Sequence, residues 1–458
     1  MLLTSLSQLN YRNLQTSHVR FAEGVTAVVG ANAAGKSNVL EAIYLSCTGE
    51  VPSSTIAESI TIGQTGGSVQ AQIEHAEGKS QVQIGLSPGH KVIRLDGQVV
   101  RAFELAKVTS AVLITPEDAN LVHGSPSGRR AYLDSLLSRV SPRYAVLLKE
   151  YGRVLEQRNA LLKHQPSSAT LEVWSSRFIE LGDEINALRR RAVGRIGSLA
   201  TARYADIIGT DVIGTDVMSA DIDGAASTGS NDVSAGSNDI NTNIINLNKT
   251  KAHVENVVDH VDVLVNAGTS ARVQTQLNAP HNQDVHTRQD THTASQLVSP
   301  QLTQEKFTTS QTQPSNGHKR LNVELLGAPE SLAEALADSY AKERARGVTV
   351  VGPHRDDLEL TLAGHSVQAY GSRGEARTTA LALRIAEYEL LRDKHGEAPI
   401  LLLDDFSAEL DMSRRDYLLR LALSTPQAIV SGTEAPPHYQ HQLKITAGKI
   451  CDAGETCG

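Results

Sequence analysis

The sequence predicts an α/β protein of two lobes, interrupted by a long low-complexity segment. Three observations support this prediction. An apolar strand, a glycine-containing loop and a helix-like run follow one another at residues 25–45, alternating strands precede residue 100, and amphipathic helices begin near residue 141. Without the low-complexity segment the 458-residue chain keeps 346 residues, enough for one bilobed domain with a substantial core.

The first part of the chain is expected to form strands, several of them with the period of two that marks a half-buried antiparallel sheet. An Asp-Gly pair inside the last segment predicts a tight hairpin turn. The expected strand segments are 3–11, 24–30, 68–75, 80–86 and 91–100.

The later part of the chain is expected to alternate helices and strands. Residues 142–164 and 171–207 are apolar at three- and four-residue steps and form a helical hairpin across 165–170. The remaining segments follow the low-complexity stretch. They are a helix at 330–346, a strand, turn and strand within 347–364, a helix at 375–395, a buried strand at 399–405, a further helix and a strand at 427–432.

Residues 206–317 differ in kind from the rest of the chain, because they are rich in Ser, Thr, Asn, Gln and Asp and hold one aromatic residue. Such a composition cannot bury enough apolar area to offset the entropy of ordering, so we predict a disordered insertion. The segment carries thirteen Asp and Glu against five Lys and Arg, which accounts for the whole net charge of −8. The remaining chain is therefore balanced, and local clusters must indicate partners.

The chain has no apolar run of the roughly 18 residues that a membrane span needs, and its start does not resemble a signal peptide. We therefore expect a cytoplasmic protein without membrane partners. Cys47, Cys451 and Cys457 are too few and too scattered for a disulfide framework, so reduced thiols are expected.

Residues 30–37, GANAAGKS, fit the phosphate-binding loop pattern G-x-x-x-x-G-K-[ST] in full. In such a loop, backbone N–H groups and a helix start surround the phosphates, while Lys36 reaches the terminal phosphates and Ser37 binds Mg²⁺. Ala33 is compatible with this loop if its φ stays negative. The predicted ATP-binding residues are Gly30, Ala31, Asn32, Ala33, Ala34, Gly35, Lys36 and Ser37.

The apolar run at 400–403 is followed by two carboxylates, Asp404 and Asp405. Such a run predicts a buried strand that carries both side chains to the edge of a sheet. Asp404 suits Mg²⁺ bound through water, and Asp405 together with Lys36 suits catalysis of hydrolysis, with Asp405 on the attacking water. A turn or a helix cap is the structural alternative for two adjacent aspartates.

Ser372, Arg373, Gly374 and Glu375 stand at the start of a long predicted helix. Hydroxyl and amide donors at a helix start suit an anion, here a nucleotide held by a second subunit. The structural alternative is an ordinary helix cap, since Ser and Gly are common there.

In this order, these stretches resemble the RecF family, whose ABC-type ATPase head is related to the heads of chromosome-maintenance and repair proteins. Residues 116–134, PEDANLVHGSPSGRRAYLD, fit the family signature P-[ED]-x3-hh-x-G-x-P-x2-RR-x-[FY]-h-[DN] at every position. The stretch LLLDDFSAELDMSRRDYL at 401–418 fits a second signature, and VGPHRDDLEL at 351–360 fits the family's G-P-H-R-x-D-L turn. The opening LNYRNLQ at 9–15 is also similar to the family's.

The resemblance implies an ATP-dependent homodimer that encloses two nucleotides. Each would lie between the phosphate-binding loop of one copy and the signature residues Ser372, Gly374 and Glu375 of the other. The resemblance also implies that Arg12 touches nucleotide phosphate and that Asp411 lies in the D-loop, which crosses between subunits. Thr433 would stand at the switch position, where other ABC proteins carry histidine.

By resemblance, ATP drives dimerisation on double-stranded DNA near single-strand gaps, and slow, DNA-stimulated hydrolysis resets the dimer. The implied purpose is recombinational repair and replication restart, in which RecR, and less directly RecO, help to load RecA onto single strands. Arginines along the second hairpin helix and after the turn at 124–126 are the candidates for salt-sensitive phosphate contacts. They are Arg129, Arg130, Arg177, Arg189, Arg190, Arg191, Arg195 and Arg203. Solvated helix faces, and lobes joined by Arg129 and Arg130, are the structural alternatives.

The predicted domains are an ATPase lobe, a helical hairpin, the insertion, the rest of the helical lobe, the C-terminal part of the head and a tail. Their bounds are 1–135, 136–205, 206–317, 318–348, 349–450 and 451–458.

Two other functions stay open. A transporter-type ABC head would need an L-S-G-G-Q signature, whereas a nucleotide-gated scaffold would bind ATP without turnover. Ala33 in the phosphate-binding loop, and Asp405 with a side chain one methylene shorter than the usual Glu, keep the scaffold open.

Overall fold

The computed structural model describes residues 1–52, 55–164, 168–218, 319–405 and 411–452. These residues belong to one packed unit, formed by Met1–Asp223 and Ser315–Gly458. Most of the predicted insertion, and part of the predicted D-loop, lie outside the described residues.

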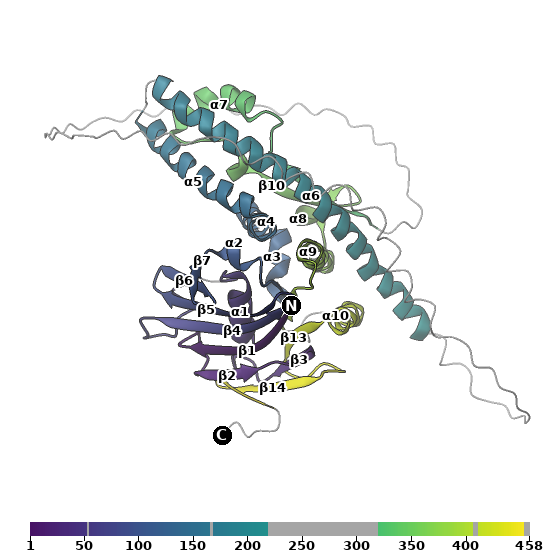
Figure 1. The fold of residues 1–458 in the computed structure, drawn as a ribbon. Helices are drawn as coiled ribbons and strands as arrows, with labels where there is room; N and C mark the ends of the chain where they lie inside the picture. Colours follow the sequence, from purple (N-terminus) through teal and green to yellow (C-terminus); the bar gives the residue numbers. More distant parts are fainter. Residues whose placement is uncertain (53–54, 165–167, 219–318, 406–410, 453–458) are drawn as a thin grey trace, which may run out of the picture. The chain divides into compact units, whose positions relative to one another are not determined.

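A mixed six-stranded sheet, ordered β15-β14-β3-β13-β12-β8, carries the phosphate-binding loop and the paired aspartates (Figure 1). Five strands are parallel and β15 is antiparallel to β14. The strands are β3 (Gly24–Val29), β8 (Ala111–Ile114), β12 (Ile400–Leu403), β13 (Gln427–Gly432), β14 (His441–Thr446) and β15 (Lys449–Asp452). β8, β12 and β13 are buried along their whole length, as expected for parallel strands covered on both faces.

Alternate side chains of β12 enter two different apolar clusters. Leu401 and Leu403 pack with the long helices, whereas Ile400 and Leu402 pack with α1 (Lys36–Thr48) and an outer sheet. Because successive side chains of a strand point to opposite faces, four apolar residues in a row fix this strand between two cores. The position of Asp404 at its end follows from that burial.

The outer sheet is antiparallel and has the order β2-β1-β4-β5-β6-β7. Its strands are β1 (Leu2–Leu9), β2 (Ser17–Arg20), β4 (Gly67–His75), β5 (Gly78–Ser87), β6 (His90–Leu95) and β7 (Gln98–Val100). The predicted Asp-Gly turn joins β6 to β7, with φ of 50° at Asp96 and 81° at Gly97. The strands expected in the first hundred residues are therefore confirmed.

Nine further helices lie in the described residues, and all but α2 add side chains to the apolar cluster on the opposite face of the mixed sheet. They are α2 (Ala102–Leu105), α3 (Ala119–His123), α4 (Pro126–Val140), α5 (Pro142–Lys163), α6 (Ser168–Met218), α7 (Leu332–Arg346), α8 (Val367–Tyr370), α9 (Arg373–His395) and α10 (Met412–Ser424), with short 3₁₀ turns η1 (Pro116–Asp118) and η3 (Pro353–Arg355). The hairpin of α5, in blue, and α6, in teal, is seen in Figure 1. Among the described residues, no helix has the length and apolar character of a membrane span.

Three local expectations were wrong. Helix α6 continues to Met218, so the first part of the predicted insertion is helical. Residues before η3 form no strand, whereas β9 (Leu321–Leu326) pairs with β10 (Asp357–Leu362), which in turn pairs with the short β11 (His365–Ser366). A strand far along the chain thus supplies the partner that local sequence could not reveal.

Cys451 is disulfide-bonded, against the expectation of reduced thiols, while Cys47 is free and buried.

The turn before β10 is held by a neutral histidine. Tyr151 Oη lies 2.7 Å from His354 Nδ1, and His354 Nε2 lies 3.2 Å from the Thr349 carbonyl oxygen. Gly352 has φ of 117°, and a Cβ there would lie 2.8 Å from Tyr151 Oη, so glycine is required. Burial lowers the pKa of His354 to about 4, which keeps the ring neutral and able to donate once and accept once.

The free energy of unfolding is expected to fall as the solution is acidified from the ordinary pKa of a histidine, 6.5, toward the lowered pKa of His354. The unfolded chain binds a proton at His354 near pH 6.5, but the folded chain does so only near the pKa of about 4. Between about pH 7 and pH 5 this single group removes about 2 kcal/mol from the free energy of unfolding. Urea unfolding at both pH values, compared with that of His354→Gln, measures the loss. An equal pH dependence in the two proteins contradicts the assignment.

Candidate nucleotide-binding site

The phosphate-binding loop connects β3 to α1, as predicted. Gly35 has φ of 112°, and a Cβ there would lie 2.8 Å from Asn13 Oδ1, so the second glycine of the loop is required. Lys36 Nζ donates to the carbonyl oxygens of Gly30 at 3.0 Å and Ala31 at 3.1 Å. The lysine therefore lies across the loop, where phosphate oxygens can replace these carbonyls as acceptors.

Asp404 meets the phosphate-binding loop at the carboxyl edge of the sheet. Ser37 Oγ donates to Asp404 Oδ1 at 3.1 Å, and Ser431 Oγ, from the end of β13, donates to the same atom at 2.6 Å. The parallel register of β3, β13 and β12 brings these three side chains together. Burial raises the pKa of Asp404, and the two hydroxyl groups oppose that shift.

The three oxygen atoms fit a magnesium ion. Mg²⁺ prefers oxygen ligands, commonly one or two carboxylates together with waters and substrate phosphates. Asp404 and Ser37 supply a carboxylate and a hydroxyl from two adjacent structural elements, and no Lys or Arg donates to Asp404 in the described structure. Ser431 is a residue that the sequence analysis missed, although its place at the end of a buried strand was visible.

Asp405 follows directly, with its backbone turned into the left-handed region at φ 47°. Its N–H donates to Ser431 Oγ at 2.9 Å. The turn separates the directions of the two aspartates, so that Asp404 faces Ser37 while Asp405 begins the next loop. Thr433 lies just beyond the end of β13 and is exposed, on the same edge of the sheet.

Ala33 differs from the expectation of negative φ, because its φ is 63°. The left-handed conformation brings Cβ close to the following carbonyl oxygen and costs about 1–2 kcal/mol for a residue with a side chain. Asn13 Nδ2 donates to the Ala33 carbonyl oxygen at 3.4 Å, and the Ala34 carbonyl oxygen accepts from Gly448 N–H at 2.9 Å. Neighbouring loops therefore hold this strained stretch in place.

Ala33→Gly is expected to raise the free energy of unfolding by about 0.5–1 kcal/mol, because relief of the left-handed strain outweighs the added freedom of the unfolded chain. Denaturant unfolding without nucleotide measures the change. Ala31→Gly, at a residue outside the left-handed region, is the matched control and is expected to lower stability. A loss of stability in both variants contradicts the strain.

Arg12 lies beside the loop but is paired with α1. Its Nη2 lies 2.6 Å from Glu41 Oε2, and its own φ is 52°. The Arg12 N–H donates to the Ser59 carbonyl oxygen at 2.9 Å, which fixes the backbone around the guanidinium. A contact with nucleotide phosphate requires competition with Glu41.

The predicted signature residues form the start of α9. Ser372 Oγ accepts from Glu375 N–H at 3.2 Å, and Glu375 Oε2 accepts from Ser372 N–H at 2.8 Å, which is a complete capping box. A hydrogen bond from Lys319 lowers the pKa of Glu375, and the Ser372 N–H adds to that effect. The capping alternative is therefore present in the structure, and it shapes the turn that would face a second subunit.

The predicted D-loop is described only at its last residue. Asp411 caps α10, and its Oδ1 accepts from Arg414 N–H at 3.0 Å. The preceding D-loop residues, 407–410, lie outside the described residues.

Comparisons with known proteins agree with this geometry. Residues 2–438 match the family described as RecF/RecN/SMC N terminal domain. Over 448 residues the chain is 38% identical to the DNA replication and repair protein RecF of Deinococcus radiodurans, which covers 98% of this chain and 95% of that protein. The chain belongs to the RecF family.

Other RecF proteins extend the comparison. The chain is 30% identical to DNA replication and repair protein RecF of Leifsonia xyli subsp. xyli, with 99% of this chain and 100% of that protein covered. Among solved structures, the recombination mediator protein RecF-ATP of the RecFOR pathway matches with a TM-score of 0.70 at 22% identity, covering 98% of this chain and 97% of that one. The structural match shows the same fold.

Two arginines expected to contact DNA are buried in this structure and form ion pairs within the protein. Arg129, 3% exposed, donates through Nε and Nη2 to the two carboxylate oxygens of Asp357, at 2.7 and 2.8 Å. Arg189, 1% exposed, lies 2.6 Å from Asp134 Oδ1 and 3.0 Å from Asp356 Oδ2. These contacts correct the DNA assignment of both residues, because a buried, paired guanidinium cannot reach phosphate.

The RecF signature at 116–134 therefore has a structural use. Arg129 and Asp134 of α4 bind the G-P-H-R-x-D-L turn, directly and through Arg189 of α6. Arg130 Nη1 adds a hydrogen bond of 2.7 Å to the Asp356 carbonyl oxygen. Arg129 and Arg130 therefore hold α4 against the 352–358 turn.

Of the remaining candidates on α6, Arg190, Arg191 and Arg195 are exposed, whereas Arg203 is half-buried and its Nε lies 3.4 Å from Glu389 Oε2. Arg190 Nη1 donates to the Pro329 carbonyl oxygen at 3.1 Å, and Arg195 pairs with Asp393 at 3.0 Å. Arg191 is exposed, and none of the interactions described for this structure involves its guanidinium. Contacts of this kind between exposed groups contribute little to stability, so Arg190 and Arg195 can leave them to bind phosphate.

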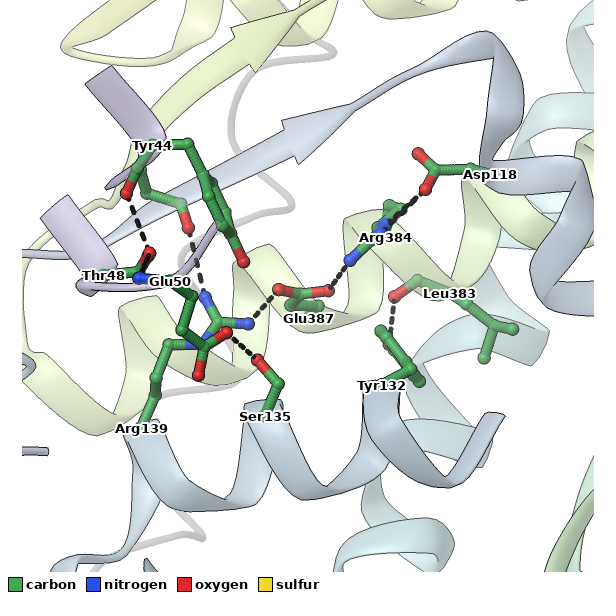
Figure 2. A network of polar contacts seen from close by, with 11 residues as sticks. Tyr44, Thr48, Glu50, Asp118, Tyr132, Ser135, Arg139, Leu383, Arg384 and Glu387 are labelled. Carbon is green, nitrogen blue, oxygen red and sulfur yellow. Dashed lines mark hydrogen bonds and ion pairs between the residues drawn. The ribbon is translucent and has the colours of Figure 1, made fainter. Parts of the chain in front are cut away.

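A chain of charged side chains, buried at Arg139 and Glu387, joins η1, α9 and α4 (Figure 2). Asp118 Oδ1 accepts from Arg384 Nη2 at 2.7 Å, and Arg384 Nη1 donates to Glu387 Oε2 at 2.9 Å. The other Glu387 oxygen accepts from Arg139, whose Nη1 also donates to the Ala111 carbonyl oxygen at 3.1 Å. The chain thus connects the helix that opens with Ser372 to the start of β8 and to η1, which follows β8. Sequence reasoning missed it, although charges on the apolar stripe of α9 were a signal.

Proposed function

We propose that this RecF-family chain is an ATP-dependent DNA-binding protein of recombinational repair and replication restart, acting in the cytoplasm. The observation that carries the proposal is the meeting of Ser37, Asp404 and Ser431 beside a complete phosphate-binding loop. This arrangement requires three strands in parallel register and has the chemistry of a magnesium–triphosphate site.

Hydrolysis is assigned to residues at the edge of the mixed sheet. Loop N–H groups and Lys36 bind the β- and γ-phosphates, and Ser37 and Asp404 hold Mg²⁺, which neutralises charge on the phosphates when bound. Asp405 orients the attacking water and accepts its proton. The shorter side chain of aspartate and the strain at Ala33 are both consistent with slow turnover.

The second half of each site is assigned to another copy of the chain. The start of α9 presents the Ser372 hydroxyl and the N–H groups of Arg373 and Gly374 at a helix N-terminus, which favours an anion. Two heads would therefore close around two nucleotides, with Asp411 and Thr433 at the contact. ATP holds such a dimer together, and hydrolysis releases it.

DNA binding is assigned to the exposed arginines of α6, Arg190, Arg191 and Arg195, with no role for Arg129 or Arg189. Contacts with phosphates suit a protein that recognises duplex DNA near a gap by its shape and charge. RecR, and indirectly RecO and RecA, are the proposed partners, in keeping with the RecFOR pathway in which a structural neighbour acts.

The decisive experiment measures the mass of the protein by sedimentation, with and without saturating ATP and gapped duplex DNA, together with ATP turnover. We expect a monomer without ATP, a dimer with ATP, and turnover that rises when gapped DNA is added. A monomer under saturating ATP that ignores DNA refutes the proposal. A stable ATP dimer with no turnover supports a nucleotide-gated scaffold instead, an alternative that Asp405 keeps open.

Arg191→Ala is expected to weaken binding to gapped duplex DNA by about 3–10-fold, and to reduce the slope of log affinity against log salt by about one. ATP turnover without DNA stays unchanged, because α6 carries none of the assigned nucleotide contacts. Fluorescence anisotropy at several salt concentrations measures both quantities. Lys79→Ala, at an exposed lysine of the outer sheet that is not a DNA candidate, is the control. An unchanged salt slope in Arg191→Ala removes this residue from the DNA surface.

A further inference from the structure

Helix α10 contacts the start of α9 through Arg414, although about forty residues separate the starts of the two helices in the sequence. Arg414, in the first turn of α10, places Nη2 3.7 Å from the position that a Cβ on Gly374 would occupy. The last residue of the D-loop and the signature turn of one copy therefore lie in the same small region.

Arg414 makes polar contacts on both sides of this region. Its Nε donates to Thr378 Oγ1 on α9 at 2.8 Å. Its Nη1 donates to Asp411 Oδ2, while its backbone N–H donates to Asp411 Oδ1. The side chain is 17% exposed, so it is largely enclosed between the two helices.

Thr378 continues the connection into the signature turn. Its hydroxyl accepts from Arg414 and donates to the Gly374 carbonyl oxygen at 2.9 Å, and the residue is 1% exposed. One uninterrupted path therefore runs from Asp411 through Arg414 and Thr378 to Gly374.

The stability of the helices does not explain a cation at this place. A positive charge near a helix N-terminus is unfavourable by about 0.3–1 kcal/mol, and Arg414 lies in the first turn of α10 and close to the start of α9. Asp411 pairs with the guanidinium of Arg414, but the contact of Arg414 with α9 is to the neutral hydroxyl of Thr378. A geometric role in joining the two helix starts accounts for the arginine better than a local gain in stability.

We propose that Arg414 is a positioning residue of the composite nucleotide site, and that it fixes Asp411 and the signature turn as one rigid surface for the second copy's nucleotide. The inference rests on the proposed ATP-dependent dimer. Binding groups that are already held in their final geometry lose less entropy when the complex forms. Loss of the arginine therefore weakens dimerisation, while the phosphate-binding loop of each copy keeps its affinity for ATP.

The test compares Arg414→Ala and Thr378→Val with the unmodified full chain. Both variants are expected to bind a fluorescent ATP analogue as monomers within twofold of the original. Their ATP-dependent self-association is expected to be at least tenfold weaker, and turnover at low protein concentration to fall in proportion. High protein concentration restores turnover, which a simple loss of folded protein does not allow.

Matched variants separate this effect from general damage. Thr378→Ser keeps the hydroxyl and is expected to self-associate within twofold of the original, and Arg420→Ala changes an exposed arginine of the same helix. If Arg414→Ala does not fold, the comparison of Thr378→Val with Thr378→Ser still decides. Normal self-association of Thr378→Val and of any folded Arg414→Ala overturns this inference alone. Failure of the unmodified chain to dimerise with ATP overturns the proposed function, and this inference with it.

Discussion

Asp405→Asn is expected to accumulate an ATP-bound dimer on gapped DNA, with turnover lowered by about 10²–10⁴-fold. The amide keeps the size of the side chain and the hydrogen bond from the Asp405 N–H to Ser431, but it cannot accept a proton from water. Asp404, Ser37 and Lys36 stay intact, so the nucleotide and the metal still bind. Sedimentation with ATP and DNA, together with phosphate release, measures both parts of the result.

Lys36→Met is the matched variant with the opposite outcome. Removing the ammonium group deletes charge-assisted contacts to the terminal phosphates, so ATP affinity is expected to fall by about 10–100-fold and the protein to remain monomeric. Lys79→Met changes an exposed lysine of the outer sheet and is expected to change neither property. If Asp405→Asn hydrolyses ATP at a rate close to that of the unmodified chain, Asp405 is not the catalytic base.

Glu387→Ala is expected to lower the free energy of unfolding by about 3–5 kcal/mol, because it removes the carboxylate that pairs with the buried Arg139 and leaves Arg384 with Asp118 alone. Glu387 is completely buried, and each of its oxygens accepts from one of the two arginines (Figure 2). The two guanidinium groups lower the pKa of this carboxyl although burial, the largest influence, acts in the opposite direction. Denaturant unfolding near neutral pH measures the loss.

Two controls define the cause of that loss. Glu387→Gln keeps a similar shape and part of the hydrogen bonding, so its loss is expected to lie between those of the original and the alanine variant. Glu74→Ala removes an exposed pair with Lys79 and is expected to change stability by less than about 1 kcal/mol. A loss below about 1 kcal/mol for Glu387→Ala would show that Arg139 and Arg384 do not need the Glu387 carboxylate for stability.

Local sequence predicted elements well where one segment contained the whole signal. The strand β12, the Asp-Gly hairpin between β6 and β7, and helix α9 were expected within a few residues of their observed bounds. The strand β9 was missed, because its partner β10 lies about thirty residues further on and its own sequence is short. The end of α6 was misplaced, since its last turns have the composition of the predicted insertion.

The candidate site shows the same division. The phosphate-binding loop and the paired aspartates were expected from their patterns, and Ser37 and Asp404 do meet. Arg129 and Arg189 were placed with the DNA surface because charge is the only property that sequence reports for them. Their carboxylate partners, Asp357, Asp134 and Asp356, come from segments more than fifty residues away.

The sequence by itself determined the class of this protein, because a phosphate-binding loop, a buried strand with two aspartates and the RecF signatures are patterns of adjacent residues. Only the tertiary structure decided which charges are available to ligands. It placed Arg129, Arg189 and Arg139 in the interior, left Arg191 exposed, and brought Arg414 to Gly374. The physical reason is that the free energy of a charge depends on its burial and its partner, and both are set by contacts between distant segments.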